Sequence, residues 1–186
     1  MPLWGEVFSR VGLRLIYNRK HAHCKDPPMT QPNTYTLRLL RAQAHQLSHE
    51  LALMPAEAML WKPAPEEWSV HECLTHLRDI ERQVFLVRIT RVIKEDTPHL
   101  PFFDEAAYHK EHWNPDEPIQ NILADFVAAR AAEVSLLESA DWSRTGVHAT
   151  RGPISLGWLA DYTAGHSWEH LSQIMRVRLY HATKKG

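Results

Sequence analysis

Two histidines near the C-terminal end of the chain are spaced for shared chemistry. His166 and His170 are four residues apart. In a helix that spacing places both imidazoles on one face, so they can reach one point in space. They interrupt an apolar stripe that recurs every three or four residues and includes Leu159, Thr163, Ile174 and Val177. Because burying two uncompensated polar rings is unfavourable, the pattern predicts a metal ion bound by both.

A third ligand is expected, since a catalytic zinc ion typically has three protein ligands and one open position. His71 and His76 are the candidates on an earlier amphipathic segment. They lie about 140° apart around a helix axis, so both cannot face the core squarely. His76 borders the apolar positions of the segment, whereas His71 comes at its start. We therefore predict that His76 is the third ligand.

Other histidine patterns are less informative, because the chain holds 13 histidines. His45 and His49 have the same spacing, but they fall at outer positions of their own apolar repeat, which predicts a solvent-facing pair. The string from His166 to His170 also fits the HxxEH motif of a metalloprotease class. That class takes an acidic third ligand downstream, and none of the 16 residues after His170 is Asp or Glu. The protease interpretation is therefore rejected.

Two residues could support the ligands from behind. Glu72 is four residues before His76 and could orient that ring or act as a base. It is also the third residue after Ser69, which predicts a capping box, and we favour this second role. Gln173 is three residues beyond His170 and could form a hydrogen bond in the site or pack at a helix interface.

Other polar residues allow two interpretations each. Arg130 and Arg144 could bind a carboxylate bidentately, but ordinary surface arginines are the favoured interpretation. Glu169 is expected to be exposed. The aromatic and histidine-rich segment 96–117 is predicted to be a long loop. It could form one wall of a pocket or simply cover the core.

Composition limits the class of protein. The chain has 186 residues, of which 44% are hydrophobic, enough for one domain with a sizeable core. A net charge of −1 argues against nucleic acid as a partner. No apolar run approaches the roughly 20 residues of a membrane span, so no stable membrane insertion is expected. The two cysteines, Cys24 and Cys73, form no disulfide framework, and a reducing, cytoplasmic location is expected. Cys73 is predicted to be a small buried side chain.

The N-terminal residues 1–28 differ from the rest, with five Lys or Arg against two Asp or Glu. The favoured interpretation is a poorly ordered extension outside the fold. A membrane-surface helix or a transit sequence is the alternative. The folded domain is predicted to span residues 29–186.

Four amphipathic patterns of about 20 residues predict an all-α four-helix bundle. They cover approximately residues 33–54, 69–95, 117–140 and 155–181. Strand signals are weak throughout, and residues 142–153 are turn-rich.

Several segments together resemble the DinB-like superfamily, in which a Trp-Ser pair and an acidic residue precede a helix-borne histidine. The matching segments span most of residues 30–181 and are residues 61–70, 72–77, 142–148 and 166–174. The chain departs from the family pattern at Ser167, where an acidic residue commonly follows the first histidine of the pair.

The resemblance implies an up-down-down-up bundle, usually dimeric, with a divalent metal ion held by His76, His166 and His170. Zinc or nickel is the expected metal. Members include thiol-dependent transferases and isomerases and metal-dependent hydrolases. The leading expectation is therefore an enzyme that transfers or adds a low-molecular-weight thiol to a small molecule. A metal-dependent hydrolase is the first alternative. A non-catalytic, metal-binding stress-response homodimer and a bundle with hydrogen-bonded, metal-free histidines are the others.

Overall fold

A computed structural model describes residues 30–184. The predicted N-terminal extension, residues 1–28, lies outside the described residues. In chain order the elements are α2 (Thr34–Ala52), η1 (Ala56–Ala58), α3 (Val70–Ile80), the π-helical turn η2 (Glu81–Phe85), α4 (Leu86–Lys94), β1 (His99–Leu100), α5 (Glu105–His112), α6 (Ile119–Glu138), β2 (Thr145–His148), β3 (Gly152–Ser155) and α7 (Leu156–Thr183). None of the described helices is long and apolar enough to cross a membrane.

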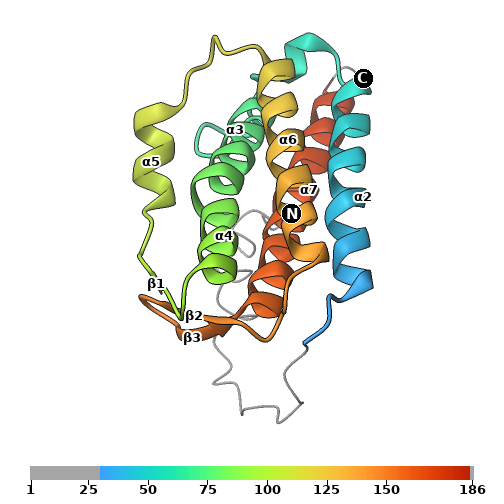
Figure 1. Ribbon diagram of the computed structural model, residues 1–186. Helices are drawn as coiled ribbons and strands as arrows, with labels where there is room; N and C mark the ends of the chain where they lie inside the picture. Colours follow the sequence, from blue (N-terminus) through green and yellow to red (C-terminus); the bar gives the residue numbers. More distant parts are fainter. Residues whose placement is uncertain (1–29, 185–186) are drawn as a thin grey trace, which may run out of the picture.

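The main helices form an up-down-down-up four-helix bundle, as predicted (Figure 1). Helices α2 and α7 run in one direction, and α3–α4 and α6 run in the other. Helix α2 packs against α6 and α7, and α3 packs against the same two helices. The segments α3–α4 and α6 can run in the same direction because residues 95–118 return along the outside of the bundle before α6 begins.

Short polar side chains start the helices. Asn33, Asp104 and Ser155 each accept a hydrogen bond from a backbone N–H in the first turn of the helix that follows. Ser69 and Glu72 form the predicted capping box at the start of α3. Such caps satisfy N–H groups that have no partner within the helix.

The apolar core consists of two clusters separated by polar side chains. One cluster contains Leu40 and Val134, and the other contains Leu47 and Phe126. Between them lies what we call the polar layer, made of Gln43, Glu81, Arg130, Glu133, Thr163 and Ser167, all of them buried. The predicted ligand histidines occur on α3 and α7 at the same level of the bundle.

The second predicted helix is present, because α3, η2 and α4 follow one another without a break over residues 70–94. The sequence did not predict that its middle turn, η2, is π-helical. A π turn adds a residue to the helical repeat, so the apolar periodicity shifts after it. Val87, which fits the unbroken stripe, is 44% exposed, whereas Ile89 and Val92 are buried. The same turn places Glu81 inside the bundle.

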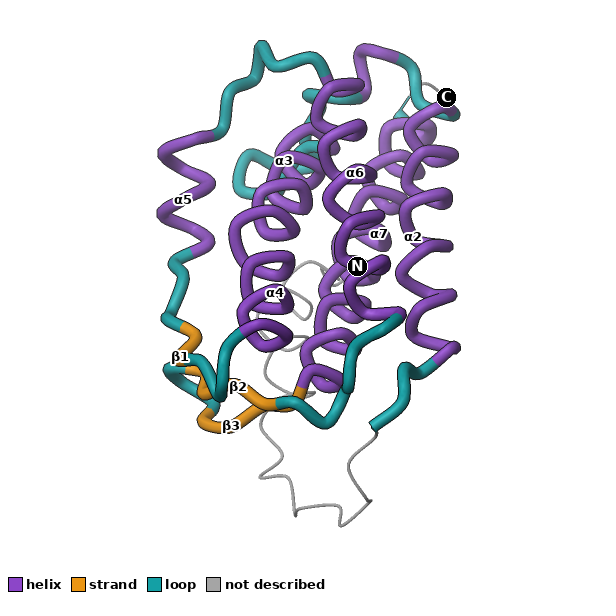
Figure 2. Tube along the Cα trace, viewed as in Figure 1, coloured by secondary structure: helices purple, strands orange, loops and turns teal. Residues whose placement is uncertain are grey.

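The predicted loop 96–117 contains a strand and a helix, so that prediction was wrong in part. Strand β1 pairs in parallel with β2, and β2 pairs with β3 in an antiparallel hairpin, at the end of the bundle where α4 finishes (Figure 2). The strands are short, which explains their weak sequence signal. Helix α5 follows β1 and lies outside α3.

Helix α5 is tied to α3 through the segment that follows it. Trp113 Nε1 donates to His71 Nδ1, and the other ring nitrogen of His71 lies 2.8 Å from the carbonyl oxygen of Glu117. Arg78 also donates two hydrogen bonds to the Glu117 carboxylate. With the pairing of β1 at its other end, α5 is held at both ends against the bundle.

Candidate metal centre

The structure brings His76, His166 and His170 together between α3 and α7. Their candidate ligand atoms all lie within 4.8 Å of one another. The Nε2 atoms of His76 and His166 are 3.2 Å apart. The ring centroid of His170 lies 4.6 Å from that of His76 and 4.7 Å from that of His166. These are the three residues that the sequence predicts as ligands.

The arrangement fits a divalent metal ion. Two imidazole nitrogens about 2.0–2.1 Å from one tetrahedral ion would lie about 3.3 Å apart, close to the distance between His76 and His166. His170 Nδ1 lies 3.1 Å from Gln173 Oε1. Because an amide oxygen can only accept, that ring nitrogen carries the proton, and Nε2 keeps its lone pair for a ligand bond. Gln173 thus makes the supporting contact that its spacing suggests.

All three rings favour the neutral form that binds metal. Burial, together with the neighbouring histidines, lowers the pKa of His76 to about 2. Burial also lowers the pKa of His166 to about 3. Burial lowers the pKa of His170 to about 4, although the hydrogen bond to Gln173 opposes this. Since metal binding requires unprotonated imidazole, the site is ready for a cation at neutral pH.

These lowered pKa values predict that the metal-free protein loses stability in mild acid. An unfolded histidine takes up a proton near pH 6.5, whereas the folded rings of His76, His166 and His170 do not. The stabilisation is therefore complete above that pH and falls as the pH drops towards 4. Each histidine lowers the free energy of unfolding by up to about 1.4 kcal/mol per pH unit in this window, and the three together lower it by up to about 4 kcal/mol per pH unit. Urea unfolding of the apoprotein at pH 7.5, 6 and 5 measures the slope.

The control for this experiment is the His166→Gln variant, whose slope should be smaller by up to about 1.4 kcal/mol per pH unit, the contribution of one histidine. Carboxylates whose pKa values are raised by burial, among them Glu105 and Glu133, also affect the slope, but they are common to both proteins. His109 and His148 also have pKa values lowered by burial, but they are common to both proteins. Equal slopes in the two proteins would contradict the assignment.

Glu105 is a site residue that sequence reasoning missed. Its Oε2 atom lies 3.5 Å from His76 Nε2 and 3.9 Å from His166 Nε2. Burial raises the pKa of Glu105, and the charge of Arg88 opposes the shift. The side chain is 39% exposed, so solvent can reach this carboxylate. Its position lets it act either as a further ligand or as a base beside the ion.

A sequence signal for Glu105 exists. Asp104 caps α5, and Glu105 and His109 follow four residues apart. That spacing puts them on one helix face, and contacts of both side chains with His76 show that this face meets the centre. The signal was hidden because the segment was predicted to be a loop.

Aromatic rings pack against the histidines of the centre. The Trp68 ring stacks on the rings of His109 and His170, with 4.6 Å and 5.9 Å between ring centroids. Its centroid lies 5.0 Å from that of His76. Both ring nitrogens of His109 are buried without a hydrogen-bond partner among the described residues. The segment 96–117 therefore supplies one wall of the site, the first of the two interpretations of its sequence.

Glu72 serves the helix rather than the ligands in this structure. One carboxylate oxygen accepts from the backbone and the hydroxyl of Ser69. The other accepts from Lys62 Nζ at 2.7 Å. Burial opposes ionisation of Glu72, but these contacts outweigh it and lower its pKa. The capping role that we favoured for this residue is the one observed.

Arg130 is buried, which corrects the favoured interpretation of a surface arginine. It forks onto the carboxylate of Glu81, and its Nη2 also donates to Ser167 Oγ at 2.7 Å. Ser167 is the position at which the chain departs from its family pattern. Its side chain points away from the ligands and into the polar layer, directly beside His166. The departure thus changes what lies behind the ligands and leaves the three histidines in place.

The remaining candidates lie outside the centre. His45, His49 and Glu169 are exposed, as expected. His71 belongs to the contacts that hold α5. Arg144 is half-buried rather than free at the surface, because it donates to backbone carbonyl groups at the end of α4.

Comparison with known proteins now identifies the class. The family model of the DinB superfamily matches residues 38–174, so the chain belongs to that superfamily. A solved structure of YfiT from Bacillus subtilis is similar in fold, with a TM-score of 0.70 and 19% sequence identity over 77% of this chain and 83% of that chain. YfiT is described as a probable metal-dependent hydrolase with an unusual four-helix bundle topology. No curated protein matches the chain in sequence.

Proposed function

We propose that His76, His166 and His170 hold a divalent metal ion and that the chain is a metal-dependent enzyme acting on a small molecule. The convergence of three neutral imidazoles within 4.8 Å carries the proposal. Membership of the DinB superfamily and the description of YfiT support it. Imidazole ligands suit both zinc and nickel, the expected metals.

Hydrolysis is the reaction that the site favours. A divalent ion in such a site lowers the pKa of water to about 7. Glu105 stands next to the ligand nitrogens, where its carboxylate can take a proton from a reacting water and return it to a leaving group. Gln173 holds the His170 ring in the required orientation, and Trp68 packs against the rings of His76 and His170.

Transfer or addition of a low-molecular-weight thiol is the second candidate. The specific observation in its favour is the ligand set, because three neutral rings leave the charge of the ion uncompensated. A metal centre of that kind deprotonates a thiol outright. Turnover of a panel of small amides, esters and electrophiles, with and without added thiols, distinguishes the two reactions. A strict thiol requirement would support transfer, and turnover without thiol would support hydrolysis.

The homodimer is part of the same proposal and rests on the family resemblance. Analytical ultracentrifugation tests it. A monomer that still binds metal and turns over substrate would remove the dimer from the account and leave the site unchanged.

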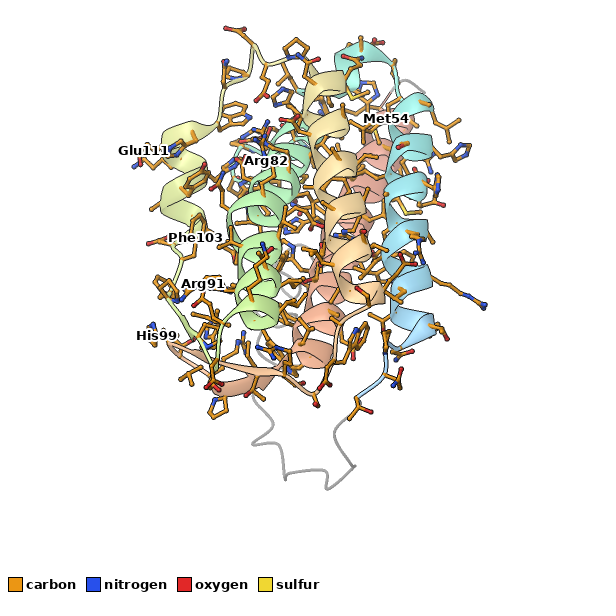
Figure 3. All side chains as sticks on the ribbon, viewed as in Figure 1. Met54, Arg82, Arg91, His99, Phe103 and Glu111 are labelled. Carbon is orange, nitrogen blue, oxygen red and sulfur yellow. The ribbon has the colours of Figure 1, made fainter. Side chains whose placement is uncertain are left out.

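Replacement of Glu105 tests its role as the base. Glu105→Gln keeps the size of the side chain and removes its basicity. General-base catalysis contributes about 10²–10⁴-fold, so kcat is expected to fall by that factor while metal content stays at the wild-type level. Loss of metal together with activity would identify Glu105 as a ligand. Unchanged kcat and metal content would exclude both roles. Glu111, which points away from the bundle on the same helix, provides the matched Glu111→Gln control (Figure 3).

A further inference from the structure

A second group of side chains adjoins the metal centre on its side towards the sheet. Tyr162 lies one turn before His166 on α7. The ring of Phe85 packs edge-on against both rings. Its centroid lies 6.0 Å from that of Tyr162 and 5.3 Å from that of His166. Trp158, one turn earlier again, stacks on Tyr162 at 4.9 Å. A row of aromatic side chains thus runs from the histidines towards the β2–β3 hairpin, with Phe85 buried and Tyr162 and Trp158 partly buried.

Two arginines interact with this row of side chains. Arg151, in the turn of the hairpin, lies 5.5 Å from the Trp158 ring and 5.2 Å from the Tyr162 ring, and it forms a hydrogen bond with Tyr162. Arg88 reaches the same place from α4. Its electrostatic neighbours are Glu105, Tyr162 and Arg151. The charge of Arg88 therefore interacts both with the carboxylate beside the metal centre and with the guanidinium of the hairpin.

Arg88 has N–H groups that are available to a ligand. Its guanidinium makes one hydrogen bond within the described part of the chain, from Nη2 to the carbonyl oxygen of Pro101 at 2.8 Å. Burial and the charge of Arg151 outweigh the attraction of Glu105 and lower the pKa of Arg88. Its positive charge is thus incompletely balanced by its protein neighbours.

A divalent ion at the histidines would give this region a net positive charge. Arg88 and Arg151 face two carboxylates, Glu105 and Glu169, both of which act on Tyr162. His148, which is buried next to the arginines, has its pKa lowered by burial and by both of them. These side chains therefore sum to about zero, and a divalent ion at the histidines would leave the whole region positive.

We propose that the substrate of the metal centre carries a carboxylate group, which Arg88 and Arg151 bind beside Tyr162 while the reacting end of the molecule lies at His76, His166 and His170. This inference rests on the proposed function, since it assigns the substrate class of that site. A carboxylate is planar and matches the fork of a guanidinium. The Tyr162 ring provides an apolar floor between the two ends.

Matched probes test the proposal. They are ω-mercapto acids of two to five carbons and the corresponding ω-mercapto amides, which differ only in the charge of the end remote from the thiol. Calorimetry with metal-loaded protein measures their affinities. Charge-assisted hydrogen bonds predict that one acid of the series binds about tenfold to a hundredfold more tightly than its amide. Equal affinities for acids and amides at every length would overturn the proposal.

Variants locate the effect. Arg151→Gln, at the exposed hairpin, should abolish the preference for the acid and leave amide affinity and metal content unchanged. Arg88→Lys keeps the positive charge but removes the planar guanidinium that can bind both carboxylate oxygens. It should therefore reduce the preference for the acid over the amide. Arg91→Gln is the control, because Arg91 lies on the same helix and likewise donates to a backbone carbonyl, that of His99 (Figure 3). A preference that survives in Arg151→Gln and Arg88→Lys would overturn the proposal.

The two proposals fail separately. Metal content is measured on every sample. If the wild-type protein holds no metal but still prefers acids to amides in a way that Arg151→Gln abolishes, the carboxylate site stands and the metal centre falls. If the protein holds metal but shows no preference, the metal centre stands and the carboxylate site falls.

Discussion

Arg130→Leu is expected to destabilise the protein by about 3–5 kcal/mol, the usual cost of leaving a buried charge without its partner. Arg130 is 1% exposed and forks onto Glu81, which is equally buried. Burial alone would raise the pKa of Glu81, but the charge of Arg130 outweighs it and lowers that pKa. Burial and the nearby Glu81 raise the pKa of Glu133 well above its ordinary value. With Glu133 protonated, Arg130 and Glu81 form a neutral pair, and removing either one leaves an isolated charge.

Equilibrium unfolding in urea measures the effect. The double variant Arg130→Leu/Glu81→Leu should recover most of the lost stability, because an apolar replacement of a whole buried pair is often neutral. Arg41→Ala is the matched control. It breaks the Arg41–Glu138 pair, which also joins two helices but is about half exposed. An exposed pair contributes about 0–1 kcal/mol. A loss below 1 kcal/mol for Arg130→Leu would contradict the role given to the polar layer.

Zinc or nickel is expected to stabilise the wild-type apoprotein and to leave the His166→Ala variant unaffected. A ligand that binds only the folded state adds about 2.7 kcal/mol at a concentration one hundred times its Kd. The expected result is therefore a large rise in Tm for the wild-type protein, which increases with metal concentration. Thermal unfolding followed by circular dichroism, in buffer without chelators, measures it.

The chain supplies its own control for this experiment. His45 and His49 repeat the spacing of His166 and His170, but they are exposed on α2. The His45→Ala/His49→Ala variant should gain as much stability from metal as the wild-type protein. If this variant loses the effect, or if His166→Ala keeps it, the metal is bound elsewhere.

The bundle could be predicted from sequence because its signals are local and repeated. Each long helix has an apolar stripe, and Ser69 and Glu72 mark the start of α3 as a capping box. The same logic separated His166 and His170, inside a stripe, from His45 and His49, outside one. The choice of His76 over His71 rested on its position around the helix, and the structure brings that ring to the other two.

The features that could not be predicted depend on contacts between distant segments. Nothing around Glu81 marks a π turn, because its partner Arg130 is 49 residues away. The burial of Arg130 likewise requires the helices to be in place. Glu105 could have been found only if α5 had been expected, and α5 is a short helix whose stability comes from its attachments at both ends.

The metal content of the purified protein tests the central claim most directly. The protein is expressed with a tag that contains no histidine and compared with the His166→Ala/His170→Ala variant, both analysed by elemental mass spectrometry. The account predicts about one equivalent of a divalent transition metal in the wild-type protein and almost none in the variant. Absence of metal from both, even after incubation with zinc or nickel, would show that the three histidines pack without an ion and would contradict the proposed enzyme.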